Sequence, residues 1–266
     1  MVDQRIEKAA DILVNYSTRV KQGEIVQIIT SPIAQDLTLE IYKNVIQNGA
    51  HATIHNSVPG ATNIYYKYAS EKQLKHFPEI AFEEIKKTDA FIAISAPLNT
   101  RELSQIDPKR VSIRQKTLEK ISEWRVKKTR WVLFDFPTSA FAQEADMSLS
   151  EFEDFVYGAT NIDWEKESKK LDKVRDLVNK TGKVRIVAKD TDITFSIKGR
   201  NCVSGNGSYN MPDGEVFTSV VEDSANGKIS FSFPTIYGAR EVEGIVLEFK
   251  DGKVIKATAK KNQDYL

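Results

Sequence analysis

The sequence has few of the residues that most often carry redox or metal chemistry. It contains one cysteine, Cys202, and three histidines among 266 residues. A single cysteine cannot form a disulfide within the chain, and disulfides are rare in reducing compartments. The first thirty residues lack the apolar core and cleavage site of a secretory signal peptide. These absences together predict a cytoplasmic protein.

Long apolar segments and an excess of charge of one sign are also absent. The longest apolar runs, near 91–97 and 131–136, are about seven residues long, whereas a membrane-spanning helix needs roughly twenty. Lys and Arg number 38 against 37 Asp and Glu, which leaves a formal net charge of +1. Because binding to a phosphate backbone depends on concentrated positive charge, nucleic acid is not expected as a partner. A membrane is not expected as a partner either.

Residues 1–145 alternate between segments with strand patterns and segments with helical spacing. Parallel strands need helical crossovers, so the alternation predicts an α/β fold with a doubly wound, mainly parallel sheet covered on both faces. The predicted strands cover about 24–30, 51–56, 89–97 and 130–137. The predicted helices cover about 3–20, 32–48, 79–87 and 107–128, with Asp3 as the N-cap of the first.

The pattern changes after residue 145. Residues 146–182 predict a helical connector of two amphipathic helices, with Ser148 and Asn161 as capping residues. From residue 183 to 266 the apolar period falls from 3.6 to 2, which predicts the first part of a β-rich (α+β) domain. Its predicted strands are 183–189, 191–199, 229–234, 245–250 and 253–260, with turns at Asn226-Gly227 and Asp251-Gly252.

The turn after the first predicted strand does not have the form of a nucleotide-binding loop. Residues 30–36 contain no glycine, and the chain has neither a GxGxxG nor a GxxxxGK[ST] motif. We therefore interpret the sheet as a scaffold. The crevice at the carboxyl ends of its strands stays open as a small-molecule site, because doubly wound sheets bind ligands there.

The histidines and the cysteine do not form a metal-binding pattern. His51 and His55 lie four residues apart on one face of a predicted strand, about 13 Å along the chain, which is too far for two ligands of one zinc ion. His76 also lies in the first domain. Cys202 has no histidine or second thiol nearby, so its surroundings support neither a nucleophile nor a soft-metal site.

The segment 200–219 combines tight turns with carboxylates. Glycines and a proline at 205, 207, 212 and 214 deliver Asp213 and Glu215 beside the predicted strand 216–219. Carboxylates held by turns suit divalent cations, which need rigid oxygen ligands. A hairpin loop with a solvated glutamate is the alternative interpretation, and one carboxylate is not a complete site.

Residues 210–218, NMPDGEVFT, resemble the signature of the thermophilic aminopeptidase family, which includes aminopeptidases T and S. Val220 departs from the proline of many relatives, which implies only a change in loop stiffness. The resemblance extends from the first helix to Leu266. Its other supporting segments are 135–159, Asp163-Trp164, 191–200, 222–234 and 244–254.

The resemblance implies a metal-dependent aminopeptidase that removes N-terminal amino acids from peptides. In that family two divalent ions, Zn, Co or Mn, activate water in a C-terminal domain. Glu215 is then a metal ligand, with Asp213 and Arg200 as supporting residues, and the remaining ligands and catalytic residues are expected beyond Leu266. No histidine follows His76, so this chain alone is expected to be an inactive fragment or a truncated relative.

Two other functions stay open. The α/β unit fits a non-catalytic interaction or dimerisation module, and a homodimer is expected. It also fits a small-molecule binder at the strand ends. Residues 183–266 are expected to self-associate through exposed sheet edges.

Overall fold

The structure, a computed structural model, describes residues 2–237 and 240–266. Its contacts divide the chain into two compact units. The first comprises the residues up to Glu165 together with Gly205–Gly214, and the second comprises Lys166–Ser204 with Glu215–Leu266. The predicted domain limits at 145 and 182 describe changes of sequence pattern, and they stay a prediction.

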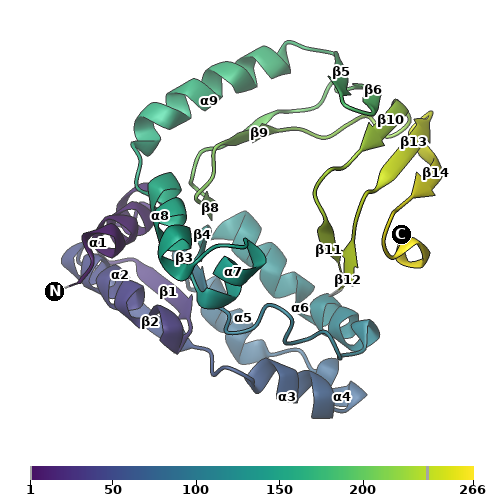
Figure 1. Cartoon of the computed structure of the whole chain (residues 1–266). Helices are drawn as coiled ribbons and strands as arrows, with labels where there is room; N and C mark the ends of the chain where they lie inside the picture. Colours follow the sequence, from purple (N-terminus) through teal and green to yellow (C-terminus); the bar gives the residue numbers. More distant parts are fainter. Residues whose placement is uncertain (1, 238–239) are drawn as a thin grey trace. The chain divides into compact units, whose positions relative to one another are not determined.

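The first unit contains a five-stranded sheet in the order β2-β1-β3-β4-β8 (Figure 1). All neighbouring strands in it are parallel. Its strands are β1 (Ile25–Thr30), β2 (His51–Asn56), β3 (Ala90–Ser95), β4 (Arg130–Asp135) and β8 (Asn210–Met211). The four longer strands were predicted from their apolar runs, whereas β8 was not.

Helices precede, connect and follow these strands. They are α1 (Gln4–Asp11), α2 (Gln35–Gln47), α3 (Ala61–Tyr68), α4 (Glu71–Leu74), α5 (Glu79–Lys86), α6 (Pro108–Lys128), α7 (Ser139–Glu144), α8 (Leu149–Thr160) and α9 (Trp164–Asn179). A π-helix, η1 (Ile12–Ser17), continues α1, and a short 3₁₀ turn, η2 (Pro32–Ala34), precedes α2.

The two faces of the sheet pack against different helices, as a doubly wound fold requires (Figure 1). On one face Ile28, Ile92 and Phe134 belong to the main core with residues of α1, α2 and α8. On the other face Phe91 packs against α5 and against partly buried residues of α6. Ile92 and Phe91 are adjacent on β3, and successive strand residues point to opposite faces. The predicted α/β fold is therefore confirmed.

The helix ends follow their capping residues. Asp3 accepts a hydrogen bond from the Arg5 backbone N–H at 2.8 Å and begins α1, as predicted. Ser148 begins α8 in a capping box with Glu151. Asn161 stands at the C-cap of α8, where its backbone N–H donates to the Tyr157 carbonyl.

Helices α3 and α4 lie between residues 56 and 79, where neither a helix nor a strand was predicted. No residue of α3 is buried. A tertiary contact holds its C-terminal end: the Arg110 guanidinium donates to the carbonyls of Tyr66, at 2.6 Å, and Ala69. Because these carbonyls lie at the C-terminal end of α3, Arg110 satisfies groups that the helix itself leaves unpaired.

The second unit is built mainly from antiparallel strands. Its largest sheet has the order β14-β13-β10-β6-β5, and two-stranded sheets pair β11 with β12 and β7 with β9. The strands are β5 (Lys183–Ala188), β6 (Thr191–Ser196), β7 (Val203–Gly205), β9 (Glu215–Phe217), β10 (Asn226–Ser230), β11 (Thr235–Tyr237), β12 (Arg240–Val242), β13 (Val246–Lys250) and β14 (Lys253–Thr258). A 3₁₀ turn, η3 (Gln263–Tyr265), follows β14.

One of the two predicted turns in this unit is wrong. Asp251-Gly252 connects β13 to β14 with positive φ at both residues, as predicted. Asn226-Gly227 instead begins β10, which starts earlier than the predicted 229–234 and ends at Ser230. A Cβ on Gly227 would stand 2.2 Å from the Asp192 carbonyl oxygen. This glycine therefore permits close strand pairing where a turn was predicted.

Within the residues that the structure describes, no helix has both the length and the apolar character needed to cross a membrane.

Candidate functional site

The loop that carries the predicted carboxylates forms part of the first unit's sheet. Its residues Asn210 and Met211 are β8 and pair in parallel with Leu133 and Phe134 of β4. The Leu133 backbone N–H also donates to the Tyr209 carbonyl at 2.7 Å. Met211 is only 2% exposed and belongs to the main core. The loop is therefore anchored by main-chain pairing and by one deeply buried side chain.

Asp213 uses its carboxylate to shape this loop. One carboxylate oxygen accepts a hydrogen bond from the Gly207 backbone N–H at 3.3 Å, and the other accepts from the Gly214 N–H at 3.1 Å. The Gly214 N–H also donates to the Gly205 carbonyl at 2.9 Å, which closes the turn. These contacts give Asp213 a structural role in the loop, because both of its carboxylate oxygens accept hydrogen bonds from main-chain N–H groups.

Two aromatic residues hold the loop from outside. The Tyr16 hydroxyl donates to the Asn206 carbonyl at 2.7 Å. The Tyr209 ring lies 5.1 Å from the Trp131 ring, centroid to centroid. Neither contact could be predicted from the sequence, since Tyr16 and Trp131 are far from the loop in the chain. The loop is held in place by the first unit.

Glu215 begins β9 and belongs to the second unit. Its side chain is exposed. An exposed carboxylate at a strand end is a possible cation ligand by chemistry, yet structural zinc sites use four protein ligands and catalytic ones three. Among residues 2–237 and 240–266, no group of three or more His, Cys, Asp or Glu side chains is placed to hold a metal ion. The described donor set does not fit a complete metal centre.

Arg200, the other predicted supporting residue, is a surface ion-pair partner. Its guanidinium lies 2.5 Å from a carboxylate oxygen of Glu222, and the Glu222 side chain is 82% exposed. Both residues belong to the second unit, whereas Asp213 belongs to the first. The roles of Asp213, Glu215 and Arg200 at a metal remain predictions.

The histidines and Cys202 have structural surroundings. His55 on β2 lies 2.7 Å from a carboxylate oxygen of Glu84 on α5. His51 is exposed at the start of the same strand, and the His76 carbonyl accepts from Arg114 at 2.7 Å. Cys202 is buried, and its backbone N–H donates to the Asn179 side-chain oxygen at 2.8 Å.

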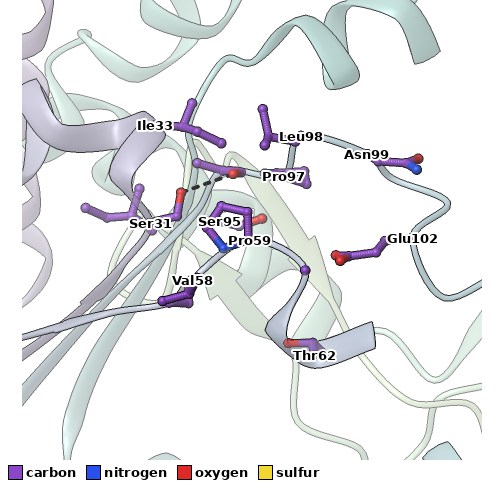
Figure 2. A pocket seen from close by; sticks show the side chains of 14 residues that line it. Ser31, Ile33, Val58, Pro59, Thr62, Ser95, Pro97, Leu98, Asn99 and Glu102 are labelled. Carbon is purple, nitrogen blue, oxygen red and sulfur yellow. Dashed lines mark hydrogen bonds between the residues drawn. The ribbon is translucent and has the colours of Figure 1, made fainter. Parts of the chain in front are cut away.

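A pocket opens at the carboxyl ends of β1, β2 and β3 in the first unit, where the sequence analysis left a small-molecule site open (Figure 2). It encloses about 390 Å³. The general rule for doubly wound sheets predicted this location, but no motif identified the lining residues.

Comparisons with known proteins relate the whole chain to one family. The model of the thermophilic metalloprotease (M29) family matches residues 2–266. Aminopeptidase 2 of Geobacillus stearothermophilus is 25% identical over 99% of this chain and 72% of its own length. Aminopeptidase AmpS of Bacillus subtilis (strain 168) is 24% identical over the same shares.

A solved structure agrees with the fold. Wild-type AmpT from Thermus thermophilus superimposes with a TM-score of 0.83 at 21% identity, covering 98% of this chain and 73% of that one. This match supports the fold described above, a parallel α/β sheet together with antiparallel sheets. The chain belongs to the thermophilic metalloprotease (M29) family.

Proposed function

We propose that this chain is the α/β domain and first β-rich part of a metal-dependent aminopeptidase acting on peptides. The family match over residues 2–266 carries the proposal, and both curated relatives are named as aminopeptidases. More than a quarter of each relative's length has no counterpart in this chain. The family's metalloprotease chemistry requires a divalent cation, for which Zn, Co and Mn are the proposed candidates.

Glu215 is the proposed metal ligand within this chain, and Asp213 and Arg200 are proposed to support its position. Glu215 directly follows the turn that Asp213 closes, so its main chain starts from a rigid segment. We propose that the other ligands come from residues outside these 266, because no histidine follows His76. By this proposal the chain alone does not hydrolyse peptides. A cytoplasmic homodimer is the proposed setting.

An aminopeptidase assay tests the proposed inactivity. The purified 266-residue chain is incubated with an aminoacyl p-nitroanilide and with Zn²⁺, Co²⁺ or Mn²⁺. No release above the chelator-treated control is expected with any of the three metals. Metal-dependent hydrolysis by this chain would contradict the proposal that the chain alone is inactive.

Paramagnetic relaxation tests the assignment of Glu215. In nuclear magnetic resonance spectra Mn²⁺ is expected to broaden the amide signals around residue 215. Glu215→Gln is expected to remove the broadening, whereas Glu119→Gln, at an exposed position of α6, serves as a control and is expected to retain it. Broadening that survives Glu215→Gln would show that the cation is held elsewhere.

Sedimentation of the purified chain measures its oligomeric state and so tests the proposed homodimer. A strict monomer would contradict that part of the proposal.

A further inference from the structure

The pocket in the first unit lies at the point where the strand order reverses, between β1 and β3. The strand order β2-β1-β3-β4 places β2 on one side of β1, and β3 and β4 on the other. The crossover connections after β1 and β3 therefore leave in opposite directions, which opens a crevice at their carboxyl ends. The pocket occupies this crevice, and its volume of about 390 Å³ is within the usual range for small-molecule sites, roughly 300–1,000 Å³.

The walls of the pocket combine short apolar side chains with hydroxyl groups (Figure 2). Ser31 donates its hydroxyl hydrogen to the Ala96 carbonyl at 3.2 Å, and Ser57 donates its own to the Thr30 carbonyl at 2.8 Å. A hydroxyl that has donated its one hydrogen still has lone pairs, so it can only accept from a ligand. These two groups therefore favour a ligand that brings hydrogen-bond donors. The apolar wall is formed by Ile33, Val58, Pro59, Ile94, Pro97 and Leu98.

Glu102 provides the charge. It is the one charged side chain among the described residues that line the pocket, and no Lys, Arg or His joins it there. Figure 2 shows its carboxylate directed toward the pocket from the loop that follows β3. A site with a carboxylate and no cation disfavours phosphates and other anions, and it favours a cationic group.

The main chain around Glu102 is held in place before any ligand binds. The Glu102 carbonyl accepts a hydrogen bond from the Asn63 side chain of α3 at 2.7 Å. On the same loop the Thr100 hydroxyl donates to a Glu144 carboxylate oxygen of α7 at 2.7 Å. Preorganisation of this kind lowers the entropy lost when a ligand is bound.

We propose that this pocket binds a small molecule with a primary ammonium group beside a short aliphatic side chain, such as an amino-acid amide. The ammonium donates to the Glu102 carboxylate, the amide N–H groups are donors for the serine hydroxyl oxygens of the pocket, and the aliphatic part contacts the apolar wall. A primary ammonium has three donors and no acceptor, which suits the Glu102 carboxylate. The site uses residues of the first unit alone and does not depend on Glu215 or on a metal.

Isothermal titration calorimetry with the whole chain tests the proposal, with leucinamide as the probe. An α-amino group titrates near pH 8, so leucinamide is cationic at pH 6.5. Saturable binding is expected at pH 6.5, and N-acetylleucinamide, which has the same side chain but no ammonium, is expected not to bind. Raising the pH to about 9.5 is expected to weaken the binding of leucinamide, because the amine loses its charge.

Three variants locate the binding. Glu102→Gln is expected to weaken leucinamide binding roughly tenfold, because it removes the charge from the central hydrogen bond. Glu119→Gln, at an exposed position of α6 outside the pocket, is the matched control and is expected to bind as the parent chain does. Thr62→Trp places a large ring at an exposed position of the pocket rim and is expected to abolish binding.

Three results would overturn the proposal: no saturable binding at pH 6.5, equal binding of N-acetylleucinamide, or unchanged affinity in both Glu102→Gln and Thr62→Trp. Circular dichroism of each variant verifies folding. None of these outcomes bears on the peptidase proposal, whose tests use Glu215.

Discussion

Gly205 and the Asp213 carboxylate lie so close together that a Cβ built on Gly205 would stand 2.3 Å from an Asp213 carboxylate oxygen. Gly205 does not have a positive φ, so the glycine is required for space and not for backbone conformation. The Gly205 carbonyl accepts from the Gly214 N–H at 2.9 Å, while Asp213 accepts from Gly207 at 3.3 Å. Asp213, which was predicted to support a metal site, is thus packed into the turn that precedes Glu215.

Gly205→Ala is expected to destabilise the first unit by about 1–3 kcal/mol, because the added methyl group overpacks the loop. Denaturant unfolding followed by tryptophan fluorescence measures this, since Trp124, Trp131 and Trp164 all lie in the first unit. Gly158→Ala is the control. At Gly158, in α8, a Cβ meets nothing within 4 Å, and a gain of up to about 1 kcal/mol is expected from helix propensity. Equal effects of the two substitutions would contradict the close contact at Gly205.

Tyr16→Phe removes the hydroxyl that donates to the Asn206 carbonyl. A loss of about 0.5–1.5 kcal/mol is expected for one such hydrogen bond. Hydrogen–deuterium exchange measures the local effect: amides of the loop 205–211 are expected to exchange faster. Tyr68→Phe, at a side chain 72% exposed, is expected to leave the loop unchanged. If loop protection stays the same in Tyr16→Phe, the hydroxyl does not anchor it.

Phe134→Ala and Leu133→Ala compare the two faces of β4 at adjacent positions. Phe134 is fully buried in the main core, whereas Leu133 is 38% exposed. Phe134→Ala is expected to cost about 3–5 kcal/mol of unfolding free energy, because it removes a buried ring and leaves a cavity. Leu133→Ala is expected to cost clearly less. The midpoint of denaturant unfolding checks both, and a larger loss for Leu133→Ala would contradict the assignment of faces.

Ser148 and Glu151 predict a pH dependence at the start of α8. The pKa of Glu151 is lowered, first by the hydrogen bond from the Ser148 hydroxyl and then by the bond from the Ser148 backbone N–H. Because the folded pKa lies below the unfolded one, the contribution to stability is complete above the unfolded value. It is lost as the pH falls through the lowered folded pKa.

Ser148→Ala is expected to move the Glu151 pKa back toward its ordinary value of 4.5, as measured by a nuclear magnetic resonance titration. The difference in stability between Ser148→Ala and the parent chain is expected to shrink in acid, as Glu151 becomes protonated in both. An unchanged Glu151 pKa in Ser148→Ala would show that the hydroxyl is not its partner.

The predicted elements that the structure confirmed all carry a local signal. The apolar runs of β1, β3 and β4 identify buried strands, and the serine and glutamate of the capping box identify the start of α8. Helix α3 was not predicted, and in the structure Arg110 of α6 binds a carbonyl at its C-terminal end. Strand β8 contains only two residues, which is too short for an alternating apolar pattern. Its partner β4 also lies far away in the sequence, so the pairing could not be predicted.

At the candidate site, the turn and its carboxylates were visible in the sequence, as glycines and a proline beside Asp213 and Glu215. What the pattern could not show is that the Asp213 carboxylate binds main-chain N–H groups, since an aspartate in a tight loop suits a metal equally well by composition. The pocket lining was also beyond prediction, because Ser31, Ser57 and Glu102 come together only when β1, β2 and β3 align in one sheet.

The sequence by itself determined the family, the doubly wound pattern of the first unit and the β-rich character of the second. These depend on residue order and on periods of two or 3.6 residues, which are local properties of a chain. Only the tertiary structure decided that the loop 205–214 joins the first unit and that Glu102 is the charged group of its pocket. Those facts depend on distances between residues remote in sequence, which packing and hydrogen bonding set after the strands and helices have formed.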